Sequence, residues 1–165
     1  MRFAIGNLIF YGETGVCRVE DIVEKEFLGE MKVCYKLQPI YQSCVVYTPA
    51  DNEVVFMRPI LTKDEANALI ESANRIVPEN YPAGSPRELT ERYDKIIKNH
   101  DCAELLKLSV SIRAKRAKLI EQKKKLSAVD ERFLKRAEDL LFGELAAAIE
   151  IEKTAMGDYI KSHAK

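Results

Sequence analysis

Apolar and polar positions alternate along the first sixty residues in a way that is typical of β-strands. The alternation is clearest over residues 31–38, where Met31, Val33, Tyr35 and Leu37 are separated by lysine, cysteine and glutamine. Four shorter apolar runs, at residues 8–11, 16–22, 44–47 and 54–57, are separated by turn-forming segments rich in glycine, proline and asparagine. Because open edges of so short a sheet invite aggregation, the pattern predicts a small antiparallel β-barrel over residues 1–60.

The pattern changes to helical periodicity after Ile60. Side chains suited to capping a helix stand at Thr62, Ser85, Asp101 and Ser127, and Glu65 and Glu88 complete capping boxes with the first two. We therefore predict helices over residues 62–76, 85–99 and 101–124, and a fourth from 127 past 148. Their apolar stripes are typical of a packed core, and the short loops favour an antiparallel bundle over residues 61–165. The expected fold class is α+β, with a β domain followed by a helical domain.

Composition adds a local charge imbalance to this picture. The chain has 165 residues, of which 47% are hydrophobic and 32% charged, with a formal net charge of zero. A foldable, neutral chain of this kind is not a general binder of polyanions. Residues 107–125, however, carry eight Lys or Arg against a single acidic residue, Glu121. This segment is either a nucleic-acid contact or an ordinary solvated helix face, and composition leaves both open.

The chain lacks the motifs of known catalytic and metal sites. Its four cysteines, Cys17, Cys34, Cys44 and Cys102, form no C-x-x-C pair, and neither histidine joins them in a ligand cluster. No phosphate-binding loop, dinucleotide fingerprint, nucleophile elbow or zinc-protease motif is present. We expect buried reduced thiols, exposed His100 and His163, no metal or cofactor, no small-molecule substrate and no enzymatic activity.

The sequence contains no run of about 20 apolar residues, the length that a membrane-spanning helix needs. It also shows no convincing amino-terminal signal segment. Together with the unpaired cysteines, these observations lead us to expect a cytoplasmic protein that does not bind membranes.

Several motifs follow one another in a specific order. They are Phe3-x-Ile5-Gly6-Asn7-x-Ile9-x-Tyr11, Gly15-Val16-Cys17-x-Val19-x-x-Ile22, Gly29, Tyr35, Thr48-Pro49 and Arg58. This series resembles the amino-terminal module of the bacterial CarD-type transcription regulators, although the family usually has proline where Gly12 stands. Arg92-Tyr93, and the series from Leu126-Ser127 through Leu134, Ala137 and Leu140 to Gly143-Glu144-Leu145-Ala146, resemble the helical domain of the same family. The resemblance spans roughly residues 1–150.

The resemblance implies a function for each domain. In the family, a Tudor-like barrel binds the β subunit of RNA polymerase, and the helical domain contacts promoter DNA just upstream of the melting region. The positions that match polymerase-binding residues of the family are Lys25, Tyr47 and Arg58. Lys25 and Arg58 keep the positive charge of the family, whereas Tyr47 does not.

The implied DNA-binding positions depart further from the family. Leu89 stands where many members have a tryptophan that wedges into the opening duplex, and Glu91 and Asp94 replace residues that are basic in some members. The DNA-binding set expected here is Leu89, Arg92, Lys115, Arg116 and Arg132. The resemblance thus implies a regulator that modulates the stability of the open promoter complex. The alternative is a polymerase-binding adaptor whose helical domain meets another protein; a continuous basic face would favour DNA.

Overall fold

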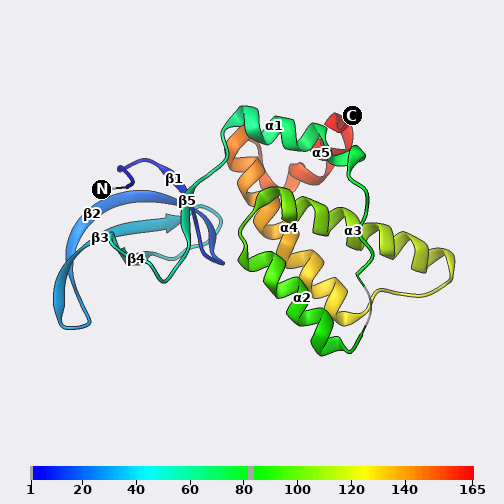
Figure 1. Ribbon diagram of the computed structural model, residues 1–165. Helices are drawn as coiled ribbons and strands as arrows, with labels where there is room; N and C mark the ends of the chain where they lie inside the picture. Colours follow the sequence, from blue (N-terminus) through cyan, green and yellow to red (C-terminus); the bar gives the residue numbers. More distant parts are fainter. Residues whose placement is uncertain (1, 82–83) are drawn as a thin grey trace. The chain divides into compact units, whose positions relative to one another are not determined.

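The computed structural model describes residues 2–81 and 84–165, and Figure 1 shows its α+β fold. The chain divides into two compact units, Met1–Leu61 and Thr62–Lys165. Among these residues, the strands lie in the first unit and the helices in the second. No helix in the described part of the chain is long and apolar enough to cross a membrane.

The first unit is a five-stranded antiparallel sheet, as the alternation predicts. Its strands are β1 (Leu8–Tyr11), β2 (Gly15–Phe27), β3 (Glu30–Pro39), β4 (Val46–Pro49) and β5 (Met57–Pro59), in the spatial order β4-β3-β2-β1-β5. The core of the sheet consists of buried side chains that include Ile9, Cys17, Val19, Tyr35 and Leu37. The phenol of Tyr35 accepts a hydrogen bond from the backbone N–H of Phe3 at 3.1 Å, which ties the amino-terminal segment to this core.

The predicted closure of the sheet into a barrel is not found. Among the described residues, β4 and β5 are the two edges of the sheet, and no ladder joins them. Both edge strands are short and end in a proline, Pro49 or Pro59. Because proline has no backbone N–H to donate, these ends cannot extend a ladder that would close the sheet.

The strand boundaries also differ from the expected ones. β2 continues to Phe27, well past its expected end at residue 22, whereas β3 is close to its expected bounds, and the two form a long hairpin that extends beyond the other strands (Figure 1). β4 begins at Val46 instead of Cys44. β5 begins at Met57 instead of Val54, because the side chain of Asn52 accepts the N–H groups of Val54 and Val55 at 2.8 and 3.3 Å and holds this segment in a turn.

The described residues of the second unit form five α-helices. They are α1 (Lys63–Glu71), α2 (Pro86–Lys98), α3 (Cys102–Glu121), α4 (Ala128–Ile149) and α5 (Met156–His163). The four predicted capping residues each accept a backbone N–H at the start of α1 to α4, and Thr62 with Glu65 forms a complete capping box. α1 ends earlier than expected and is followed by a 3-10 turn, Ala73–Arg75. α5 was not predicted.

Two expectations about cysteine and histidine burial are wrong in part. Cys17, Cys34 and Cys102 are buried and reduced, but Cys44 is exposed, because it precedes β4 instead of lying within it. Burial raises the pKa of the Cys17 thiol to about 12, so this thiol stays protonated. His163 is exposed, whereas His100 is only 8% exposed at the turn between α2 and α3.

Candidate polymerase-binding face and helical-unit site

The sheet brings two of the three expected polymerase-binding residues together. Lys25 on β2 pairs with Lys32 on β3, and Tyr47 on β4 pairs with Lys36 on β3. Directly paired residues share a face, and Lys32 and Lys36 are four positions apart, so Lys25 and Tyr47 lie on the same face of the sheet. The Lys25 ammonium lies 3.6 Å from the centre of the Tyr47 ring. This is a cation–π contact between two exposed side chains.

Arg58 lies elsewhere in the sheet. It belongs to β5, which is the edge strand farthest from β4 in the strand order. Its guanidinium lies 4.6 Å from the centre of the Phe10 ring and donates a hydrogen bond to the carbonyl of Pro59 at 3.1 Å. Lys25 and Tyr47 are therefore in contact with each other, whereas Arg58 lies at the opposite edge of the sheet in the strand order.

In the helical unit, Lys115 belongs to a buried polar network. Its ammonium lies 2.9 Å from the carboxylate of Asp130, whose side chain is 1% exposed. The same carboxylate accepts hydrogen bonds from the Tyr93 hydroxyl at 2.6 Å and the Ser127 hydroxyl at 3.0 Å. This network ties α2, α3 and the first turn of α4 to one another.

The hydrogen bonds of this network shift the pKa values of Asp130 and Tyr93. Burial opposes the charge of Asp130, but hydrogen bonds from Tyr93, Lys115 and Ser127 outweigh it and lower the pKa of the carboxyl. Burial and the hydrogen bond to Asp130 raise the pKa of Tyr93, so this phenol remains a donor. Lys115 is thus the partner of a buried carboxylate.

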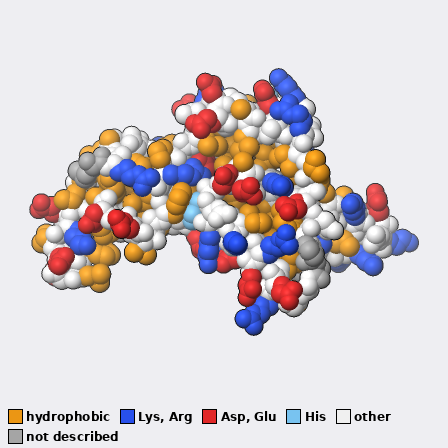
Figure 2. All heavy atoms as spheres, viewed as in Figure 1, with side chains coloured by type: hydrophobic (Ala, Val, Ile, Leu, Met, Phe, Trp, Pro, Cys, Tyr) orange, Lys and Arg blue, Asp and Glu red, His pale blue; other side chains and the backbone are white. Residues whose placement is uncertain are grey.

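Two of the other expected DNA-binding residues are also in ion pairs. Arg92 lies 3.9 Å from Glu79, and Arg116 lies 3.6 Å from Glu131. Arg132 is exposed, with its guanidinium 5.0 Å from the centre of the Phe133 ring. Figure 2 shows acidic and basic side chains interspersed over the visible face of the helical unit. The four basic residues lie on three helices among acidic neighbours, so they do not form a uniformly basic stripe.

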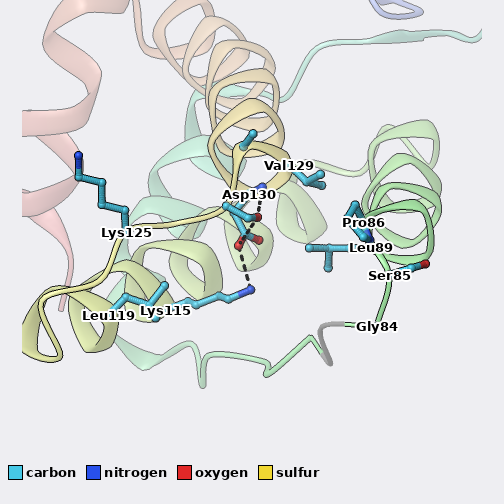
Figure 3. Close-up of a pocket in the computed structure, with 11 residues that line it drawn as sticks. Gly84, Ser85, Pro86, Leu89, Lys115, Leu119, Lys125, Val129 and Asp130 are labelled. Atoms are coloured by element: carbon cyan, nitrogen blue, oxygen red, sulfur yellow. Dashed lines mark hydrogen bonds and ion pairs between the residues drawn. The ribbon is translucent and has the colours of Figure 1, made fainter.

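Leu89 does not protrude from the helical unit. It is 5% exposed and lines a pocket of about 390 Å³ between the start of α2, the end of α3 and the start of α4. Figure 3 shows its side chain pointing into this pocket, with Val129 opposite on α4 and Leu119 on α3. The position that matches the family tryptophan therefore contributes to the wall of a mostly apolar pocket. Sequence reasoning missed the pocket because its lining comes from three separate helices.

The described residues contain no group of three or more His, Cys, Asp or Glu side chains that could hold a metal ion. The buried acidic residue at the pocket, Asp130, is already held by Tyr93, Lys115 and Ser127.

One comparison with known proteins identifies the first unit. Residues 3–61 match the family model described as the CarD-like/TRCF RID domain, and this segment contains Lys25, Tyr47 and Arg58. No curated protein matches the chain. The match ends where the helical unit begins. The resemblance to the CarD type is thus confirmed over residues 3–61, which match a CarD-like RNA polymerase-interacting domain, whereas the resemblance of the helical unit stays a prediction.

Proposed function

We propose that this chain is a bacterial transcription regulator that binds the β subunit of RNA polymerase and modulates the stability of the open promoter complex. The observation that supports it best is the RID match over nearly the whole first unit. In this proposal the helical unit contacts promoter DNA through Leu89, Arg92, Lys115, Arg116 and Arg132. Such a regulator acts by binding energy alone: it shifts the equilibrium toward the promoter state for which it has the higher affinity.

The face formed by Lys25 and Tyr47 is the proposed centre of polymerase docking. Tyr47 lacks the charge of the family residue, but its ring holds the Lys25 ammonium at 3.6 Å and leaves both side chains exposed. Lys32, on the strand between them, adds further positive charge to the same face, whereas the charge of Lys36 is paired with Glu20 at 3.8 Å. An acidic patch on the β subunit would complement this surface.

Replacing Lys25 with glutamate should weaken binding to purified β subunit by roughly tenfold or more, because charge reversal at an interface lowers the association rate and removes a contact. Surface plasmon resonance with the full chain measures this effect. Lys63→Glu, at an exposed position in the helical unit, changes net charge equally and should bind normally. Equal affinities of both variants would exclude Lys25 from the interface.

The residues proposed to contact DNA differ in whether an existing ion pair must break before they can bind a phosphate. A phosphate that binds Arg116 or Arg92 competes with Glu131 or Glu79. A phosphate that binds Lys115 competes with the buried carboxylate of Asp130. Arg132 is exposed and has an aromatic ring as its neighbour, so it can approach a phosphate without breaking an ion pair.

We therefore expect Arg132→Ala to weaken DNA binding about equally on unrelated sequences and to reduce the salt dependence by roughly one unit of slope. Titration of labelled duplex DNA at several salt concentrations measures both quantities. Asp139→Ala, an exposed acidic change on the same helix, serves as a control and should not reduce the slope. An unchanged slope for Arg132→Ala would remove this residue from the DNA contact.

The ion pairs support a second candidate function, an adaptor whose helical unit binds another protein. Three of the four basic residues expected to contact DNA already lie beside Glu79, Asp130 or Glu131. The two candidates differ in the polymerase-bound state, where the adaptor should leave the footprint of polymerase on promoter DNA unchanged. An extended footprint upstream of the melting region would favour the DNA contact.

A further inference from the structure

The turn between β2 and β3 carries an apolar side chain in an unfavourable place. Leu28 is 92% exposed and has φ 53°, followed by Gly29 with φ 81°. Glycine and asparagine suit this left-handed conformation, whereas leucine gains nothing from it locally and buries nothing. Leu28 therefore contributes neither to the turn nor to the core, and its exposed apolar side chain is available for contact with a partner.

The neighbours of Leu28 give this turn a defined chemistry. Glu26 pairs with Met31 across the hairpin, and Met31 is 68% exposed. Phe27 pairs with Glu30 next to the turn, and Glu26 and Glu30 are both exposed. The tip of the hairpin thus carries a protruding apolar side chain, Leu28, flanked by carboxylates; we call this side chain the knob. A partner surface that complements it is an apolar pocket with basic groups at its rim.

The helical unit contains such a pocket. Its wall of Leu89, Leu119 and Val129 encloses about 390 Å³, which is ample space for a leucine side chain together with part of a neighbouring apolar one. The stem of Lys125 lines the pocket, and Figure 3 shows its ammonium pointing away from the pocket. A partner that fills the pocket would therefore meet this charge outside it.

The charges near this pocket differ from those elsewhere in the helical unit. Lys118, Lys123, Lys124 and Lys125 are exposed and form no ion pair among the described residues, unlike Lys115 and Arg116. Glu121 is the one acidic residue between positions 118 and 125. This end of the unit, the lysine-rich turn between α3 and α4, therefore has uncompensated positive charge next to an apolar pocket.

We propose that the pocket of one molecule receives the β2–β3 turn of a second copy of this chain. Leu28 enters the pocket, and Glu26 and Glu30 meet the lysine-rich turn. A nucleobase fits less well, because the lining has no aromatic ring or guanidinium on which a base could stack. The contact joins two different surfaces, so each copy has both a turn to donate and a pocket to fill.

The test uses two variants of the full chain that each disable one of the two surfaces. Leu28→Asn removes the knob, and asparagine suits the left-handed turn, so the fold should keep or gain thermal stability. Lys124→Glu with Lys125→Glu reverses two exposed charges at the pocket rim. Sedimentation velocity over about 10 µM to 1 mM covers the affinities expected of so small an interface. We expect the mass of the wild-type chain to rise with concentration and each variant alone to remain monomeric.

Mixing the two variants distinguishes this contact from any other self-association. The Leu28→Asn variant keeps its pocket and the double lysine variant keeps its turn, so an equimolar mixture should form dimers and nothing larger. Val54→Asn, at a 93% exposed apolar position in the same unit, is a matched control and should associate like the wild type.

A wild-type chain that stays monomeric up to about 1 mM would overturn the proposal. So would self-association of Leu28→Asn alone, or a mixture that remains monomeric. Binding of these variants to the β subunit is measured separately, so failure of this contact leaves the proposed polymerase binding untouched.

Discussion

Replacing Asp130 with asparagine is expected to lower the free energy of unfolding of the helical unit by about 3–5 kcal/mol, the range for breaking a buried ion pair. Asp130 is fully buried and accepts hydrogen bonds from Tyr93 and Ser127 in addition to its ion pair with Lys115. Asparagine keeps an acceptor for the hydroxyls but leaves the Lys115 ammonium without its counter-charge. Urea denaturation followed by circular dichroism at 222 nm measures the loss.

The pH dependence of the same experiment provides a second readout. Because the pKa of Asp130 is lowered in the folded state, its stabilising effect is complete above the ordinary aspartate pKa of about 4. The effect is lost as pH falls through the lower folded-state pKa, and Asp130→Asn should lack this loss. Asp139→Asn, which pairs with Lys153 on the surface, should change stability by less than about 1 kcal/mol. Equal stability of Asp130→Asn and Asp139→Asn would contradict the role of the network.

Replacing Leu89 with alanine should destabilise the helical unit by about 2–5 kcal/mol, the range for truncating a buried leucine. The side chain is 5% exposed and lies between α2, α3 and α4. Leu89→Trp should be tolerated far better, because the larger ring can extend into the adjoining pocket. Thermal unfolding of both variants tests these expectations, and equal destabilisation by alanine and tryptophan would contradict the pocket geometry.

The same two variants address the function of this position. If Leu89 acts as an apolar wedge, Leu89→Ala should shorten the lifetime of the open promoter complex and Leu89→Trp should lengthen it. The lifetimes must be compared at a temperature where both variants are folded, with the β subunit saturated. Lifetimes equal to that of polymerase alone for the wild type and both variants would remove the wedge and favour the adaptor.

Features fixed by neighbouring residues could be predicted from the sequence. The starts of α1 to α4 depend on a capping side chain and the next three residues, so Thr62, Ser85, Asp101 and Ser127 were identified correctly. α5 has only eight residues, and its N-cap residue is Ala155, whose side chain cannot accept a hydrogen bond. The sequence therefore contains no capping signal for the start of this helix. Helix starts marked by a capping side chain could therefore be predicted, whereas the short last helix, which lacks one, could not.

Features that depend on distant residues could not be predicted. Lys115 looks like a solvated cation on a basic helix, and only the fold shows that it is the partner of Asp130 on the next helix. The alignment of Leu89 with the family tryptophan gives its position but not the direction of its side chain, which packing determines. Lys25 and Tyr47 were expected separately, and the register of β2, β3 and β4 brings them into contact.

The division of the chain at Leu61–Thr62 also affects the affinity that the helical unit needs for its own target. When the first unit is docked on a large complex, the helical unit is tethered there at an effective concentration on the order of millimolar. A target on that complex is then occupied even if its intrinsic dissociation constant lies in the high micromolar range. If the sheet docks on polymerase as proposed, the affinity of the helices for their own target can remain low enough for rapid release.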